Sequence, residues 1–135
     1  MFKNKSLIFA AAVVAVVVVV GVVLLLQTQA AQAAPKITPA EYQSQYGETG
    51  TTHLLIDVRT ADEFATGHIH GAVNIPLQSI QDHMSEIPHD VPVIVYCHSG
   101  NRSGQAGRAL VEAGYTNIQD LGGINAWTEQ GYPIE

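Results

Sequence analysis

Hydrophobic and polar positions divide the chain into two parts. From Leu7 to Leu26, twenty consecutive uncharged residues, rich in valine, follow the two lysines Lys3 and Lys5. A helix of that length spans about 30 Å, the thickness of the hydrocarbon core of a bilayer. Over residues 35–135, short apolar stretches alternate with polar ones, as in a folded domain. We therefore expect an N-terminal hydrophobic helix followed by a single domain.

Two interpretations of residues 1–34 stay open. An A-x-A cleavage site is present at Ala31-Gln32-Ala33, which favours a signal peptide that is removed. The apolar core 7–26 is longer than a signal peptide needs, which favours an uncleaved signal-anchor transmembrane helix. In both cases the lysines stay on the cytoplasmic side and the domain is exported. The sequence thus predicts a periplasmic or extracytoplasmic domain, attached to the membrane through residues 7–26 if the segment is retained.

Within residues 35–135, the hydrophobic pattern predicts strands alternating with helices. Strands are expected at 53–58, 72–75, 93–96 and 118–121, and helices at 38–46, 60–66, 78–87, 103–113 and around 126–127. Two of the helices begin with the T-x-x-E pattern of a capping box, at Thr38 and Thr60. Short apolar strands alternating with helices predict an α/β fold, a small parallel sheet flanked by helices on both faces.

Charge and cysteine content narrow the classes of function. Residues 35–135 hold twelve acidic but only four basic side chains, a net charge of −8. Because nucleic-acid binding requires a basic face, this balance argues against it. The domain has one cysteine, Cys97, so it cannot form an internal disulfide. A lone thiol in an oxidising compartment is a liability unless it has a role, so Cys97 is the first candidate for chemistry.

The position of Cys97 supports a functional role. It directly follows an apolar strand, and ligands of open α/β sheets bind beyond the carboxyl ends of the strands. A short polar loop containing Gly100 then leads to a helix expected to begin at Ser103. Loop N–H groups and a helix N-terminus both favour an anion. A helix terminus stabilises an anion such as the Cys97 thiolate by only about 0.3–1 kcal/mol. We therefore expect the loop N–H groups to contribute more than the helix to stabilising the thiolate.

The segment Cys97-His98-Ser99-Gly100-Asn101-Arg102-Ser103 resembles the active-site loop of the rhodanese family. Further motifs of that family occur in the same order and at similar spacing: Asp57-Val58-Arg59, Glu63-Phe64, Gly67-His68-Ile69, Gly71-Ala72-Val73-Asn74-Ile75-Pro76, Gly122-Gly123 and Ala126-Trp127. The resemblance covers about residues 36–133, nearly the whole expected domain. A single domain with an export segment is similar to the small periplasmic rhodaneses.

The resemblance implies sulfane sulfur transfer. The Cys97 thiolate would attack thiosulfate or a similar donor, release sulfite and form a persulfide, from which cyanide or a thiol acceptor would take the sulfur. This chemistry requires neither a metal nor an organic cofactor. The candidate substrate-binding residues are His98, Ser99, Gly100, Asn101, Arg102 and Ser103.

Other residues of these motifs are expected to support the loop. Asp57 and Arg59 suit a partly buried ion pair that braces the loop, and the alternative is that Arg59 reaches the substrate. Arg102 is expected to bind the substrate anion or to tie the loop to an acidic neighbour. His68 is expected to be a hydrogen-bonded structural residue. The remaining histidines show no metal-ligand spacing, so no metal site is predicted.

Two other functions remain as alternatives. The same fold supports cysteine phosphatases and arsenate reductases, but phosphatases place five residues between cysteine and arginine, whereas four separate Cys97 from Arg102. The domain could instead serve as a sulfur relay or an interaction module for a partner protein. The intact cysteine and loop argue against an inactive interaction module.

Overall fold

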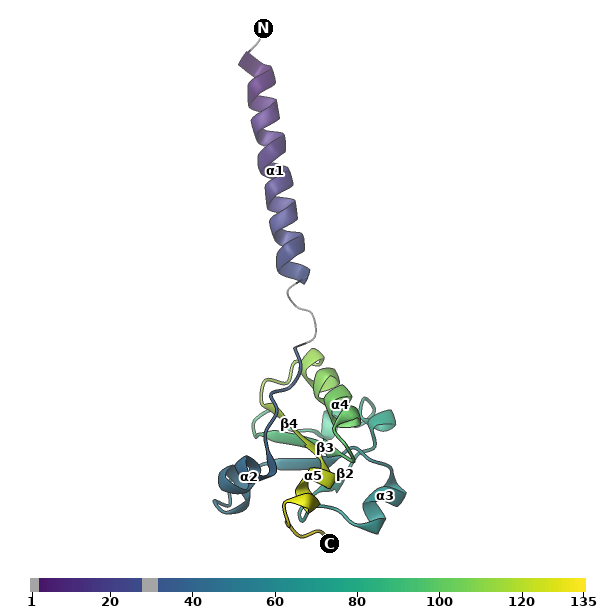
Figure 1. The fold of residues 1–135 in the computed structure, drawn as a ribbon. Coiled ribbons are helices and arrows are strands. Elements are labelled where there is room, and N and C mark those ends of the chain that lie inside the picture. The colour runs from purple at the N-terminus through teal and green to yellow at the C-terminus, as the bar shows by residue number, and fades with distance from the viewer. Residues whose placement is uncertain (1–2, 28–31) are drawn as a thin grey trace. The chain divides into compact units, whose positions relative to one another are not determined.

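The computed structural model describes residues 3–27 and 32–135, which belong to two units, 1–30 and 31–135. The first unit contains one helix, α1 (Lys3–Gln27), drawn in purple in Figure 1. Among the residues that the structure describes, no helix is long and apolar enough to cross a membrane. The export segment 1–34 therefore stays a prediction, and residues 28–31, which include the start of its A-x-A site, lie outside the described residues.

The second unit is built on a four-stranded parallel sheet. Its strands are β1 (Leu54–Asp57), β2 (Val73–Asn74), β3 (Val93–Cys97) and β4 (Ile118–Gly123), in the order β2-β1-β3-β4. The helical segments are α2 (Pro39–Tyr42), the π-helical turn η1 (Gln43–Gly47), α3 (Ala61–Thr66), the 3-10 turns η2 (Leu77–Ser79) and η3 (Met84–Glu86), α4 (Asn101–Glu112) and α5 (Ile124–Glu129). The predicted parallel sheet is confirmed.

Both faces of the sheet are covered, as predicted. Every residue of β3 is buried, and successive side chains point to opposite faces. Val93, Val95 and Cys97 pack into a core that includes residues of α4, whereas Ile94 and Tyr96 belong to a second core with residues of α2, η1 and α5. The site-bearing strand is thus fixed from both sides, with its carboxyl end at the edge of the sheet where α4 begins (Figure 1).

Two local predictions were wrong, and a third segment is helical as predicted but changes its geometry. Residues 78–87 form two 3-10 turns instead of one helix: their N–H groups donate three residues back, as from Ile80 to Leu77 and from Ile87 to Met84, and Ile87, which precedes Pro88, is extended. The Tyr115 hydroxyl anchors the last turn through the carbonyls of Met84 and Ile87. The helix expected at 38–46 changes from α to π geometry after Tyr42. Gly122 and Gly123 belong to β4, where the pairing register shifts, instead of forming a turn.

Both predicted capping boxes are present. Thr38 Oγ1 accepts the N–H of Glu41, whose carboxylate accepts the N–H of Thr38. Thr60 and Glu63 make the same pair of bonds at the start of α3. The second box also positions the carboxylate of Glu63, which has a further partner in the site.

Candidate active site

Cys97 is the last residue of β3 and the start of the loop that leads into α4. Its side chain is 1% exposed. Gly100 adopts a left-handed conformation, with φ of 100°, and its N–H donates to Cys97 Sγ at 3.0 Å. A residue with a side chain is strained at such a φ, so glycine suits this position. The loop therefore directs a backbone dipole at the sulfur, a contact that stabilises a negative charge there.

Ser103 provides a second polar group beside the sulfur. Its Oγ lies 3.6 Å from Cys97 Sγ and within hydrogen-bond distance of the carbonyl oxygens of Gly100 and Gly122. The Ser103 side chain is fully buried in the first turn of α4. Since a hydroxyl hydrogen rotates freely between acceptors, this hydroxyl can donate to the sulfur once the thiol is ionised.

The remaining loop residues lie at the surface. The side chains of His98, Ser99 and Asn101 are exposed. Asn101 Oδ1 accepts a hydrogen bond from Gln105 one turn along α4. The helix begins at Asn101, two residues earlier than predicted, because Gly100 serves as its N-cap. His98 and Ser99 are thus placed at the entrance of the loop, whereas Gly100 and Ser103 contact the sulfur.

Arg102 is held by Glu63 from the start of α3. The two side chains form a bidentate pair, with Nη1 to Oε2 at 2.6 Å and Nη2 to Oε1 at 2.8 Å. The hydrogen bond from Arg102 is the main cause that holds the pKa of Glu63 far below its ordinary value. The structure shows the contact with an acidic neighbour that was expected for Arg102, and binding of the substrate anion by Arg102 stays a prediction. The T-x-x-E pattern identified Glu63 as a cap, but gave no indication of this partner.

We expect Glu63→Gln to lower the free energy of unfolding by about 1 kcal/mol at pH 7, because the pair is bidentate but partly exposed. Folding lowers the pKa of Glu63 from its ordinary value of 4.5. The unfolded chain therefore takes up the proton first as the pH falls, and the stabilisation present above about pH 4.5 is lost below it. Denaturant unfolding followed by fluorescence of Trp127, the chain's one tryptophan, measures this. A difference between wild type and variant that is as large at pH 3.5 as at pH 7 would contradict the role of the pair. Glu112→Gln, at an exposed position of α4, is the control.

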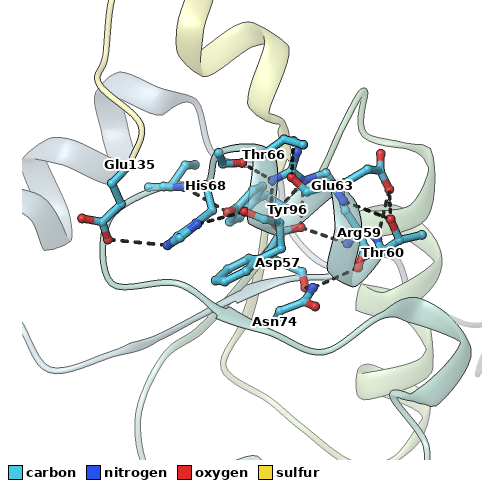
Figure 2. Close-up of polar contacts among 12 residues, drawn as sticks. Asp57, Arg59, Thr60, Glu63, Thr66, His68, Asn74, Tyr96 and Glu135 are labelled. Carbon is cyan, nitrogen blue, oxygen red and sulfur yellow. Dashed lines mark hydrogen bonds and ion pairs between the residues drawn. The ribbon is translucent and has the colours of Figure 1, made fainter.

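A buried polar network lies at the end of β1 (Figure 2). Asp57 is 0% and Arg59 5% exposed, and they pair at 2.6 Å. Arg59 also donates to the carbonyl of Gly67 at 2.7 Å, and Asn74 donates to the backbone carbonyls of Asp57 and Arg59. Burial opposes the charged form of Arg59 and would lower its pKa. The hydrogen bonds and the negative charge of Asp57 outweigh burial, so the pKa of Arg59 is raised. The guanidinium therefore joins the end of β1 to the end of α3, and contact between Arg59 and the substrate stays a prediction.

His68 contacts both the end of α3 and the C-terminal residue Glu135. Its ring stacks on Phe64 with centroids 3.8 Å apart, and its Nδ1 lies 3.1 Å from the Phe64 carbonyl oxygen. Its backbone exchanges two hydrogen bonds with Glu135, both 2.9 Å long. Figure 2 shows the His68 ring directed toward the Glu135 carboxylate, with its Nε2 3.6 Å from Oε1. The structure thus places His68 in a structural position, apart from Cys97.

Gly123 packs directly against the active-site loop, a feature that the sequence did not predict. A Cβ at this buried position would collide with the His98 carbonyl oxygen and lie 2.8 Å from Ser99 Cα. The end of β4 and the loop after Cys97 are therefore in backbone-to-backbone contact. The Gly122-Gly123 pair indicated a turn, whereas its role is to permit this close approach.

Comparison with known proteins identifies the family. A model of the rhodanese-like domain matches residues 38–130. The chain belongs to the rhodanese family. It is 48% identical over 82 residues to a sulfurtransferase of Allochromatium vinosum, covering 60% of this chain and 77% of that protein. It is 35% identical over 101 residues to the thiosulfate sulfurtransferase GlpE of Pseudomonas fluorescens, covering 74% of this chain and 90% of that protein.

A solved structure of a rhodanese-related protein from Thermoplasma volcanium has the same fold. It superposes with a TM-score of 0.67 at 30% identity, and covers 75% of this rhodanese chain and 97% of the other. The resemblance noted in the sequence is thus confirmed for the family and the fold. Sulfurtransferases among the relatives support sulfurtransferase activity in general for this rhodanese.

Proposed function

We propose that this protein transfers sulfane sulfur from thiosulfate or a similar anionic donor to a thiophilic acceptor, through a persulfide on Cys97. The observation that carries the proposal is the N–H of Gly100 directed at Cys97 Sγ from 3.0 Å, at the carboxyl end of a buried strand. Relatives that are named thiosulfate sulfurtransferases, in Pseudomonas fluorescens and Escherichia coli, support the choice of donor.

In the first half-reaction, the Cys97 thiolate attacks the outer sulfur of thiosulfate. A bond forms between Sγ and that sulfur, the bond to the sulfonate sulfur breaks, and sulfite leaves with the electron pair. The persulfide anion that remains carries the single negative charge that the thiolate had. The loop N–H group of Gly100 and the hydroxyl of Ser103 lie beside Sγ, where they would stabilise the Cys97 thiolate before the attack and again when it leaves in the second half-reaction.

In the second half-reaction, the acceptor attacks the terminal sulfur of the persulfide. With cyanide the product is thiocyanate, and with a thiolate it is a new persulfide. In either case the bond between the two sulfurs of the enzyme breaks and Cys97 leaves as a thiolate, ready for the next donor. His98 and Ser99 are exposed, so this part of the loop is open to solvent.

We expect thiosulfate to add about 32 Da, one sulfur atom, to the intact protein, because a covalent intermediate must accumulate when no acceptor is present. Mass spectrometry before and after thiosulfate, and again after cyanide, follows the gain and loss of sulfur. Cys97→Ala is the matched control, and should show no gain. No adduct with thiosulfate or any other sulfane donor would overturn the proposed chemistry.

Two other functions are distinguished by related measurements. Slow transfer from thiosulfate combined with rapid transfer from one partner protein would favour a sulfur relay. Hydrolysis of p-nitrophenyl phosphate faster than sulfur transfer would favour a phosphatase. The engagement of both terminal nitrogens of Arg102 by Glu63 argues against the phosphatase, which needs that guanidinium on the phosphate.

We further propose that residues 1–34 export the domain. The support is the apolar run after Lys3 and Lys5 and the A-x-A pattern that ends at Ala33. The contacts of the domain include Ala34, which is 6% exposed, and the Pro35 carbonyl, which accepts the N–H of Asp120. Cleavage after Ala33 would leave these contacts intact. Fractionation of expressing cells, with the intact mass of the recovered protein, separates an exported cleaved form from an exported anchored form. Recovery of the whole chain in the cytoplasmic fraction would refute export.

A further inference from the structure

Arg102 is the arginine or lysine closest to Cys97 along the chain, and it is only partly shielded from solvent. It lies in the first turn of α4, and its side chain is 28% exposed, whereas Arg59, sealed against Asp57, is 5% exposed. The hydrogen bond to Glu63 is the largest cause that raises the pKa of Arg102, and the negative charge of the Cys97 thiolate is a further one. The guanidinium is therefore within electrostatic reach of both the Glu63 carboxylate and the sulfur.

The Glu63 carboxylate is fixed independently of Arg102. The capping box at the start of α3 holds it, because Oε2 accepts both the N–H and the hydroxyl of Thr60, at 3.0 and 3.1 Å (Figure 2). The two carboxylate oxygens also accept hydrogen bonds from the two terminal nitrogens of Arg102. Arginine binds oxyanions in this same bidentate manner. An oxyanion that pairs with these nitrogens must therefore displace Glu63, and the long arginine side chain is the part that would move.

The pair also determines how much negative charge the loop can receive. The hydrogen bond from Arg102 is the main cause that keeps the pKa of Glu63 far below its ordinary value, so the carboxylate is ionised near neutral pH. The polar groups that the structure shows beside Cys97 Sγ, the N–H of Gly100 and the hydroxyl of Ser103, are dipoles without net charge. Because Coulomb energy is proportional to the charge of each partner, the carboxylate opposes a doubly charged donor twice as strongly as a singly charged one.

We infer that Glu63 is a specificity-determining residue, whose carboxylate competes with the donor anion for Arg102 and so disfavours sulfur donors of high negative charge. This inference rests on the proposed transfer through Cys97. Thiosulfate, a dianion, and methanethiosulfonate, a monoanion, react in the same way. The outer sulfur forms a bond to Sγ as its bond to the oxidised sulfur breaks, and sulfite or methanesulfinate leaves with the electron pair. The two donors thus differ in charge but deliver the same sulfur atom.

The test is the variant Glu63→Gln, because glutamine at this position can keep the capping box while the charge is removed. We expect kcat/KM for thiosulfate to rise about tenfold, equivalent to about 1.4 kcal/mol. For methanethiosulfonate the energy should be half as large, which is a rise of about threefold. With 2-mercaptoethanol, an acceptor that is mainly uncharged at pH 7, kcat/KM should stay within about twofold of wild type. The full chain is measured at constant ionic strength, in a mild detergent because of its apolar segment.

The sign of the change separates competition from simple support of the loop. If the pair only braces the loop, Glu63→Gln would lower kcat/KM for both donors. That result, no change, or an equal rise for both donors would overturn the inference. In an Arg102→Gln background, Glu63→Gln should no longer raise kcat/KM. A rise that persists there would show that Glu63 repels the donor directly, and would also overturn it.

Glu112→Gln is the matched control. It removes the same charge at an exposed position about 15 Å further along α4 than Arg102. This separation exceeds the Debye length of about 8 Å at physiological ionic strength. The control should therefore leave kcat/KM for both donors unchanged.

Binding of the donor is measured separately in the Cys97→Ala background, where no sulfur can be transferred. Calorimetry should show that Glu63→Gln binds thiosulfate about tenfold more tightly. Equal affinities, or no binding to either variant, would overturn the inference. Failure of the wild type to form a persulfide would instead refute the proposed function, and the calorimetric comparison would still decide whether Glu63 opposes the dianion.

Discussion

Arg59→Met is expected to lower the free energy of unfolding by about 3–5 kcal/mol, since it leaves an uncompensated buried charge. The carboxylate of Asp57 is completely buried and receives three hydrogen bonds from the Arg59 side chain. After the substitution, only the backbone N–H of residue 59 would remain of the bonds that Arg59 now makes to it. A typical domain has only 5–15 kcal/mol of stability, so this loss is a large fraction of the total.

Denaturant unfolding followed by Trp127 fluorescence measures the effect, because Trp127 is 2% exposed in the second core and reports on the domain itself. The exposed Arg108→Met is the matched control, with an expected change within about 0.5 kcal/mol. The double variant Asp57→Asn/Arg59→Met removes both charges and should recover part of the loss. A single Arg59→Met variant as stable as wild type would show that Asp57 finds other compensation.

The sequence predicted the fold well wherever short-range chemistry determines structure. The T-x-x-E patterns at Thr38 and Thr60 each produce a capping box, since the bonds involved span only three residues. The apolar run at 93–96 is a fully buried strand, as parallel strands covered on both faces are. Cys97 could then be chosen as the candidate site residue, because ligands of open α/β sheets bind beyond the carboxyl ends of the strands.

Predictions failed where a distant residue decides the local structure. The spacing of Ile80, Met84 and Ile87 favours a helix, but the segment forms 3-10 turns, and the Tyr115 hydroxyl, about thirty residues away, anchors the last turn through the carbonyls of Met84 and Ile87. In the same way, Arg102 could be assigned to the substrate or to an acidic neighbour from its position alone. Its partner Glu63 lies 39 residues earlier and approaches only when α3 packs near the loop. Neither contact has a signal in local sequence patterns.

Gly123→Ala is expected to reduce kcat/KM for transfer from thiosulfate to cyanide about 100-fold while the protein still folds. The added methyl group would overlap the His98 carbonyl oxygen and approach Ser99 Cα to 2.8 Å, and neither backbone atom can move without the loop. Because φ of Gly123 is −110°, alanine is not strained by its own backbone, so the effect comes from collisions of the methyl group. The methyl group would also meet the side-chain oxygen of Asn125, which can rotate away, whereas the two backbone atoms of the loop move only with the loop. A misplacement of about 1 Å at a reacting centre can cost about 10²-fold in rate.

Gly114→Ala separates this effect from loss of stability. Gly114 has φ of 94° after the end of α4, and no atom lies within 4 Å of an added Cβ. Alanine there should cost about 1–2 kcal/mol of backbone strain and leave turnover of the folded protein unchanged. If the contact between β4 and the loop positions Cys97, steady-state kinetics should show a lower kcat/KM for Gly123→Ala and an unchanged one for Gly114→Ala. Denaturant unfolding should show the loss of about 1–2 kcal/mol for Gly114→Ala. Full activity of Gly123→Ala would mean that the loop tolerates displacement and that the sulfur is positioned by Gly100 and Ser103 alone.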